Sequence, residues 1–103
     1  MERVAVIGTG YFSQYHFDAW KRLKANVVGV CSLDLKKAKS VDSNFKNCKF
    51  FENYEEMIKI THPTLIDIII PPNDHLGDSI LFKIKVINLI QFDFCISTMS
   101  SYY

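Results

Sequence analysis

The sequence lacks an excess of either charge. Twelve Lys and Arg residues against eleven Asp and Glu residues leave a net charge of +1 over 103 residues. A chain this close to neutral has no electrostatic reason to bind nucleic acid or an anionic membrane. It also lacks a long apolar run, because Lys83, Lys85 and Asp93 interrupt the late apolar stretch well short of about 20 apolar residues. We therefore expect neither nucleic-acid nor membrane partners.

Cysteines are few and do not form pairs in the sequence. Cys31, Cys48 and Cys95 are odd in number, and no two lie at metal-ligand spacing. This pattern favours free thiols in a reducing compartment. The chain passes from Met1 directly into an apolar strand pattern, with no room for the charged and apolar regions of a signal peptide. The expected location is therefore the cytoplasm.

The motifs of several enzyme classes are missing. The sequence has no Gly-x-Ser-x-Gly elbow of a serine hydrolase and no Walker lysine after its glycine-rich segment. His16, His62 and His75 are far apart in sequence and form no zinc-binding pattern, so no metal site is expected. His16 lies among apolar residues of a helix, which favours a packing role. No catalytic residue can be assigned on these grounds.

What the sequence does contain is an alternation of short apolar runs and amphipathic segments. Strands are predicted at residues 4–7, 27–31, 49–51 and 65–70. The first predicted helix carries an apolar face of Phe12, Tyr15, His16, Ala19, Trp20 and Leu23. A second helix is expected after Asp34, and a third runs from an Asn53 cap to about residue 60.

This alternation predicts an α/β fold: a Rossmann-like parallel sheet with helices on both faces, incomplete, with about four or five strands. Asp67 is the one poor fit within the apolar strands, and it is expected at a strand entrance or near an edge. An uncovered last strand would allow self-association. We divide the chain into a dinucleotide-binding domain, residues 1–81, and a divergent, poorly ordered tail, residues 82–103, because the periodicity degrades there.

The segment that carries chemistry is the loop between the first strand and the first helix. It reads Gly8, Thr9, Gly10, Tyr11, Phe12 and Ser13, the pattern G-x-G-x-x-S. The first glycine permits a tight turn, the second lets the backbone approach a pyrophosphate, and a small third residue allows close helix–strand packing. The helix N-terminus then favours the anion. The alternative is a glycine turn that only joins strand to helix.

The end of the second strand bears on the choice between NAD and NADP. A carboxylate there would bind the ribose 2′-hydroxyl and disfavour a 2′-phosphate, but Ser32 occupies that position and Asp34 follows two residues later. Ser32 would tolerate a phosphate, with Lys36 or Lys37 as cationic partners. The pattern favours NADP, with NAD as the alternative. In the simpler interpretation, Asp34 only caps a helix and the lysines only form a solvated face.

Several segments together resemble a known family. They are residues 4–13, His16, residues 27–31, residues 53–56 and residues 68–75 with the pattern Pro-Pro-x-x-His. Over residues 3–81 the chain resembles the N-terminal domain of the glucose–fructose oxidoreductase/inositol dehydrogenase/MocA family. The resemblance implies a nicotinamide-dependent oxidoreductase acting on sugars, cyclitols or related polyols. It also implies cofactor contacts near the middle and nicotinamide side from Ile70, Pro71, Pro72, Asn73 and His75.

The sequence departs from this family after residue 81. It has no Glu-Lys-Pro motif, and the role of that motif's lysine does not transfer to Lys83 or Lys85. The family's second domain, which holds the substrate, is also not recognisable, so the chain alone is expected to be inactive and truncated. One alternative is a non-catalytic module that binds a dinucleotide or a partner chain. Another is an S-adenosylmethionine enzyme, which the Pro-Pro-x-x-His element argues against.

Overall fold

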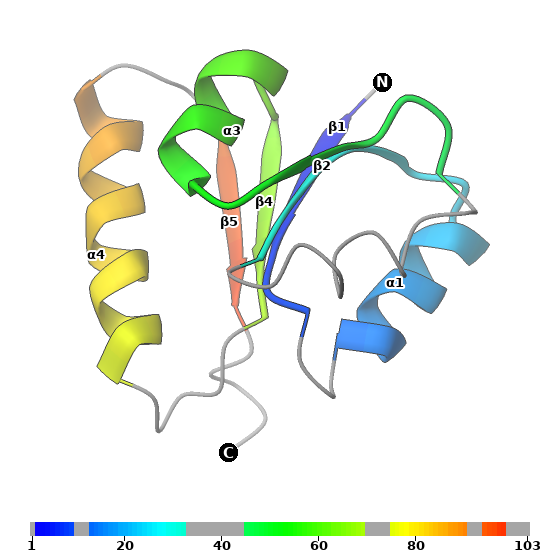
Figure 1. The fold of residues 1–103 in the computed structure, drawn as a ribbon, viewed down its shortest axis with the longest axis horizontal. Helices are drawn as coiled ribbons and strands as arrows, with labels where there is room; N and C mark the ends of the chain where they lie inside the picture. The colour runs from blue at the N-terminus through cyan, green and yellow to red at the C-terminus, as the bar shows by residue number, and fades with distance from the viewer. Residues whose placement is uncertain (1, 10–12, 33–44, 70–74, 91–93, 99–103) are drawn as a thin grey trace.

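The computed structural model describes residues 2–9, 13–32, 45–69, 75–90 and 94–98. Within these ranges, strands and helices alternate along the chain (Figure 1). The strands are β1 (Arg3–Ile7), β2 (Asn26–Cys31), β3 (Lys49–Phe51), β4 (Leu65–Ile68) and β5 (Cys95–Thr98). The helices are α1 (Ser13–Arg22), α3 (Tyr54–Thr61) and α4 (His75–Ile90). The helix predicted after Asp34 falls almost entirely outside the described residues. None of the described helices is long and apolar enough to cross a membrane.

The five strands form one parallel sheet in the order β3-β2-β1-β4-β5. The prediction of a parallel Rossmann-like sheet is thereby confirmed. Along the chain, β2 and β3 follow on one side of β1, and β4 and β5 then follow on its other side. Such a reversal leaves a crevice beyond the carboxyl ends of the two central strands, which is where α/β sheets bind ligands. Here that switch point lies between β1 and β4, while β3 and β5 are the edges.

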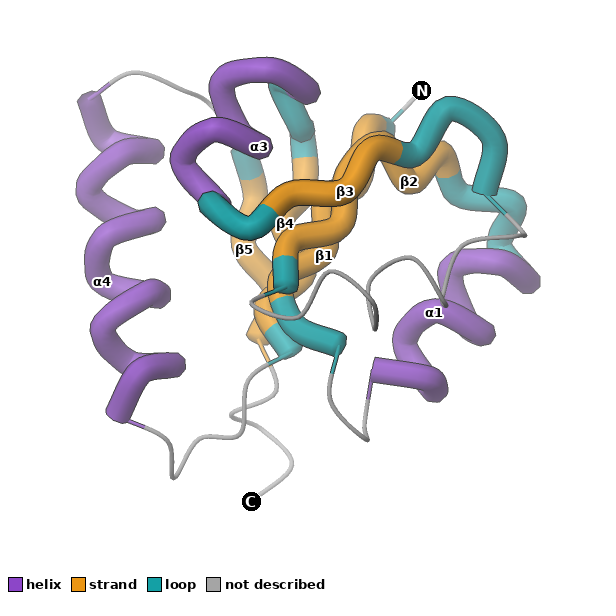
Figure 2. The backbone as a smooth tube through the Cα atoms, in the orientation of Figure 1, coloured by secondary structure: helices purple, strands orange, loops and turns teal. Residues whose placement is uncertain are grey.

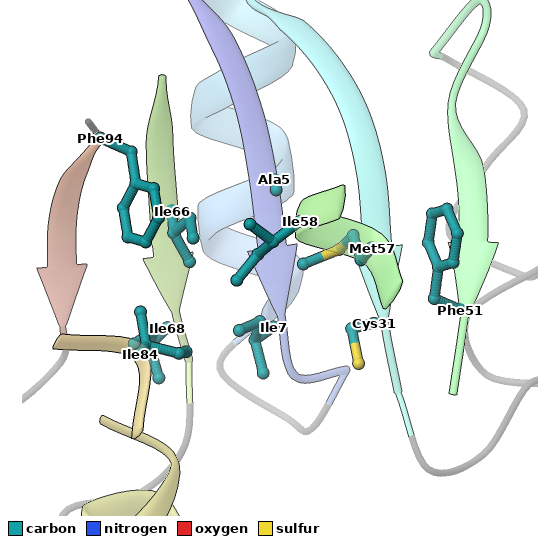
Figure 3. Close-up of a cluster of buried hydrophobic side chains, with 10 residues drawn as sticks. All are labelled: Ala5, Ile7, Cys31, Phe51, Met57, Ile58, Ile66, Ile68, Ile84 and Phe94. Carbon is teal, nitrogen blue, oxygen red and sulfur yellow. The ribbon is translucent and has the colours of Figure 1, made fainter. Parts of the chain in front are cut away.

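Helices cover the two faces of the sheet unequally. Among the described elements, α1 lies on one face, and α3 and α4 lie on the other (Figures 1 and 2). The core under α3 and α4 consists of Ala5, Ile7, Cys31, Phe51, Met57, Ile58, Ile66, Ile68, Ile84 and Phe94 (Figure 3). The smaller core on the α1 face consists of Val4, Val6, Phe17, Val27, Val30 and Ile69. Alternate residues of β1 supply the two cores, as the period of a strand requires.

The buried face of α1 differs from the predicted one. Tyr15 and Leu23 were expected in the apolar face, yet they are 58% and 71% exposed. Ser13 and Phe17 are the buried residues of this helix instead. Ser13, His16, Phe17 and Trp20 share the face toward the sheet at the spacing i, i+3, i+4 and i+7. His16 and Trp20 lie on this face as predicted, whereas Phe17, which the predicted face left out, is its buried apolar residue.

The expected place of Asp67 at a strand entrance or an edge is wrong. Asp67 is the third residue of β4, pairs with Val6 of β1 and Ser97 of β5, and is 1% exposed. A carboxylate at such a position needs hydrogen-bond donors from elsewhere in the fold. Two side chains of α1 supply them, as described below.

Helix α3 begins and ends at clear local signals. The Asn53 side-chain oxygen accepts hydrogen bonds from the backbone N–H groups of Glu55 and Glu56, at 2.8 and 3.1 Å. At the other end His62 adopts a left-handed conformation, with φ 47°, and its N–H donates to the Ile58 carbonyl. Pro63 follows and cannot continue the helix. The helix therefore lies where its cap and the proline predicted it.

Regular structure continues beyond residue 81. Helix α4 extends through the proposed domain boundary to Ile90, and β5 includes Ser97 and Thr98, which the sequence pattern placed in an unstructured tail. The Asn88 side chain joins the two elements: its Nδ2 donates to the Phe94 carbonyl at 3.0 Å, and its Oδ1 accepts from the Phe94 N–H at 2.9 Å. This pairing is not periodic in sequence, so hydrophobic patterning does not detect it. Residues 99–103 lie outside the described part of the chain.

Candidate functional site

Gly8 occupies the point where β1 ends at the switch point of the sheet. Its φ of +113° is one that residues with a side chain rarely adopt. Its N–H donates to the Cys31 carbonyl of β2 at 2.9 Å. A Cβ atom here would lie 2.4 Å from the Ile69 carbonyl oxygen, just after β4. Only glycine therefore lets the chain leave β1 between its two neighbours.

Thr9 and Ser32 connect the loop to the end of β2. The Thr9 Oγ1 and Ser32 Oγ atoms are 2.6 Å apart and share a hydrogen bond. Ser32 is 8% exposed, and its N–H donates to the Phe51 carbonyl of β3 at 2.9 Å. At the position where a carboxylate would bind the ribose, this chain thus has the buried hydroxyl of Ser32, which forms a hydrogen bond with Thr9 of the loop.

Helix α1 begins at Ser13 with its N-terminus after this loop. Ser13 is 4% exposed, as expected of a small residue at a close contact between helix and sheet. The first turn of α1 contains no acidic residue, whereas Lys21 and Arg22 lie in its last turn. The N-terminal N–H groups and the positive end of the helix dipole therefore face no carboxylate from that turn. Such an end suits a phosphate group.

The structure brings three predicted site residues together at the carboxyl ends of β1 and β2, namely Gly8, Thr9 and Ser32, and the fourth described one, Ser13, begins α1. The chain just after β4 joins the same edge, because the Ile69 N–H donates to the Ile7 carbonyl at 2.7 Å. His75 begins α4, and its side chain is not described. The other predicted residues lie outside the described ranges: Gly10, Tyr11, Phe12, Asp34, Ile70, Pro71, Pro72 and Asn73.

A polar cluster between α1 and β4 is not evident from the sequence pattern. His16 Nδ1 donates to Asp67 Oδ2 at 2.8 Å, and Trp20 Nε1 donates to the same oxygen at 2.9 Å. A carboxylate only accepts, so the imidazole proton lies on Nδ1 in this contact. Asp67 Oδ1 is buried without a hydrogen-bond partner among the described residues. The available signal was an aspartate inside an apolar strand, with His and Trp four residues apart on the neighbouring helix.

Cys31 lies at the end of β2, below this edge, and its side chain belongs to the core. Burial raises the pKa of the Cys31 thiol to about 11, from an ordinary value of 9.0. The thiol is therefore protonated at neutral pH and is a packing group. The described residues also contain no group of three or more side chains that could hold a metal ion.

Comparison with known proteins identifies the family. The profile of GFO_IDH_MocA, described as the oxidoreductase family with an NAD-binding Rossmann fold, matches residues 2–84. No curated protein matches the sequence.

Solved structures show the same fold. The WlbA (WbpB) dehydrogenase from Thermus thermophilus in complex with NAD and alpha-ketoglutarate is 24% identical, with a TM-score of 0.59, over 69% of this chain and 26% of its own. The same enzyme with NAD and UDP-GlcNAcA is 23% identical, with a TM-score of 0.60, over 84% of this chain and 30% of its own. The myo-inositol 2-dehydrogenase from Lactobacillus plantarum is 18% identical, with a TM-score of 0.65, over 99% of this chain and 38% of its own.

The chain thus spans less than half the length of each of these solved proteins. The profile, in contrast, covers most of this sequence and includes the glycine loop, β1 to β4 and the start of α4. The resemblance inferred from the sequence motifs is confirmed. The chain belongs to the GFO_IDH_MocA oxidoreductase family and carries its NAD-binding Rossmann domain.

Proposed function

We propose that residues 8–13 bind the diphosphate of NAD or NADP at the N-terminus of α1. The observation that carries this proposal is Gly8, which adopts a positive φ and approaches the Ile69 carbonyl so closely that no side chain fits. This is the turn that a phosphate-binding loop needs between its strand and its helix. The buried Ser13 and the first turn without carboxylates support the same assignment.

Further contacts are assigned to the segment that follows β4. Ile70, Pro71, Pro72, Asn73 and His75 continue from the strand next to β1. Because parallel strands end at one edge, we expect this segment to start beside the glycine loop. Its two prolines have no N–H to donate, so the polar contacts would come from backbone carbonyls, Asn73 and His75. Their placement along the middle and nicotinamide side of the cofactor stays a prediction.

NADP is the preferred cofactor in this proposal, and NAD is the alternative. Ser32 brings no negative charge to the end of β2, so nothing at that position repels a 2′-phosphate. The hydroxyl is already engaged with Thr9, which makes it a neutral wall of the ribose site. Lys36 or Lys37 would supply the positive charge, while Asp34 would favour the 2′-hydroxyl of NAD.

The proposed reaction class is oxidation or reduction of an alcohol of the sugar or cyclitol type. The nicotinamide supplies or accepts the hydride when it is bound, and this chain's residues hold and orient the dinucleotide. The solved relatives named above include an inositol dehydrogenase and a dehydrogenase bound to UDP-GlcNAcA. No substrate-contacting residue is assigned here. The absence of a Glu-Lys-Pro motif in this sequence favours a second candidate, a dinucleotide-binding module without turnover.

A calorimetric titration with NADPH and with NADH tests the proposal, alongside circular dichroism as a check of the fold. We expect binding of both, tighter for NADPH. Gly10→Val should abolish binding of both, since a side chain there would meet the pyrophosphate, while leaving the dichroism spectrum unchanged. Wild-type affinity in that variant, or a folded chain that binds neither dinucleotide, would contradict the assignment.

The cofactor preference has its own test in Ser32→Asp. A carboxylate at this position should shift the ratio of affinities toward NADH by about tenfold, because it repels the 2′-phosphate. An unchanged ratio would mean that residue 32 does not face the ribose. Assay of NADP reduction with myo-inositol then separates an active oxidoreductase from a binding module.

A further inference from the structure

The polar contact between α1 and β4 lies near the carboxyl end of β1, the strand that leads into the proposed phosphate loop. His16 and Trp20 donate to one oxygen of Asp67, at 2.8 and 2.9 Å. Asp67 pairs with Val6 in the sheet, and only Ile7 separates Val6 from Gly8. The carboxylate therefore holds the middle of α1 against β4, beside the strand that leads into the loop.

Phe17 also packs α1 onto the sheet, in the core with Val4, Val6, Val27, Val30 and Ile69. Of its ten residues only Ser13 and Phe17 are buried. The Phe17 ring packs against Phe45, with 6.0 Å between the ring centroids. His16 and Trp20 are about one helical turn apart, so both can reach the same oxygen only in one rotational orientation of α1 about its axis. The two hydrogen bonds thus add a directional constraint on the rotation of α1 to this apolar packing.

Stability is a poor explanation for a carboxylate at this position. The other residues of β4 are apolar, and burying a charge seldom adds net stability over an apolar side chain of similar size. Only one carboxylate oxygen is used, because Asp67 Oδ1 is buried without a partner among the described residues. The carboxylate instead fixes the orientation of α1, since it accepts hydrogen bonds from two specific atoms of that helix.

We propose that Asp67 is a positioning residue for dinucleotide binding, acting through His16 and Trp20 to aim the N-terminus of α1 at the diphosphate. This inference rests on the proposed function. The attraction of a helix terminus for an anion falls off within its first turn, and hydrogen bonds weaken steeply when misaligned. A small rotation or tilt of α1 therefore reduces phosphate binding without unfolding the chain.

Two substitutions at Asp67 separate positioning from stability. Asp67→Val removes both hydrogen bonds and leaves the His16 and Trp20 donors without their acceptor, so its thermal midpoint should fall, and its affinity is measured well below that midpoint, where the chain is folded. We expect its affinity for NADPH to fall by about tenfold, since α1 loses its fixed rotation. Asp67→Asn retains an oxygen that accepts both bonds, so it should rescue the affinity to within about threefold. Asp18→Asn is the matched control, because it removes a carboxylate from the exposed face of α1 and should leave the affinity unchanged.

The outcomes separate this inference from the proposed function. A wild-type chain that binds neither NADPH nor NADH overturns both. Wild-type binding with equal affinity in Asp67→Val overturns the positioning role alone. If Asp67→Val does not fold, Trp20→Phe removes one of the two donors and keeps the ring in place. That variant should bind about threefold more weakly with an unchanged fold, and unchanged affinity there overturns the positioning role as well.

Discussion

At the scale of single residues, Gly8 is the position most tightly constrained by its surroundings. Both its left-handed φ and the 2.4 Å approach of a hypothetical Cβ to the Ile69 carbonyl exclude a side chain. Backbone atoms cannot shift as a flexible side chain can. The constraint is therefore set by the sheet itself, and it holds whether or not a ligand is bound.

We expect Gly8→Ala to lower the free energy of unfolding by about 2 kcal/mol or more, through backbone strain and the clash with Ile69. Urea unfolding measures it. Gly29→Ala is the comparison, because a Cβ there would lie 2.9 Å from the Met57 Cγ and 3.2 Å from the Thr61 Cγ2, which are side-chain rather than backbone atoms, and Gly29 has no positive φ. The comparison variant should lose about 1 kcal/mol. A Gly8→Ala variant as stable as Gly29→Ala would contradict this reading of the turn.

Cys31 makes the stability of the chain sensitive to alkaline pH. Burial raises the pKa of its thiol to about 11, above the ordinary value of 9.0. Below pH 9 the thiol is protonated in both the folded and the unfolded chain. Between the two values the unfolded chain loses its proton first, so stability declines as the pH rises toward 11.

The measurement is the free energy of unfolding at several alkaline pH values for the wild type and for Cys31→Val. Other groups titrate in the same range, and burial raises the pKa of Tyr54 as well. The difference between the two proteins isolates the thiol. We expect the stability of the wild type relative to the variant to fall between about pH 9 and 11. Parallel curves would show that Cys31 is not buried in solution.

At the scale of elements, the junction of α4 and β5 depends on one side chain. Asn88 makes both a donor and an acceptor contact with the backbone of Phe94, as a neighbouring strand would. Phe94 itself is buried in the core under α3 and α4. The contact therefore fixes where the edge strand begins and how its first apolar residue enters that core.

We expect Asn88→Leu to destabilise the chain by about 2 kcal/mol, because it leaves two backbone groups of Phe94 without partners. Hydrogen exchange should then speed up in β5, at the amides of Cys95 and Ile96, before it does so in β1. Lys85→Leu, an exposed change on the same helix, is the control and should leave both rates unchanged. Equal acceleration in β1 and β5 would mean that Asn88 supports the whole sheet.

At the scale of the whole molecule, ligand binding and folding are coupled. The proposed site draws on the ends of β1 and β2, the start of α1 and the segment after β4, which come together only in the folded sheet. A dinucleotide that binds only the folded chain raises its free energy of unfolding by about 2.7 kcal/mol at a hundred times its dissociation constant.

For a domain near this size, that gain should raise the thermal midpoint by about 10–20 °C in the presence of NADPH. Thermal unfolding followed by circular dichroism measures the shift. Gly10→Val should show no shift at the same NADPH concentration, which controls for nonspecific effects of the ligand. A wild-type midpoint that does not move with NADPH would contradict binding at the assembled site.

The order of elements as far as β4 could be predicted from the sequence, since each depends on local signals, whereas α4 and β5 could not, because the periodicity degrades after residue 81. The apolar run before Gly8, the Asn53 cap and Pro63 lie within or beside the elements that they delimit. The alternation of strands and helices then leaves a parallel sheet as the simplest fold, and five parallel strands are observed. The glycine loop could be recognised because its glycine spacing is itself contiguous in sequence.

Tertiary structure alone decided the features that depend on distant partners. Asp67 receives its donors from 47 and 51 residues away, so nothing near it in sequence indicated that a carboxylate could be buried there. The inward face of α1 also depends on the sheet: Phe17 is buried in the core with Val4 and Val6, whereas Tyr15 and Leu23, which the apolar pattern placed there, are exposed. Hydrophobic periodicity identifies an apolar stripe, and it detects neither how that stripe is rotated against the sheet nor a buried carboxylate whose donors lie on a remote helix. Local sequence therefore determined the elements as far as β4 and the loop, while packing on the sheet and long-range hydrogen bonding decided how α1 is oriented.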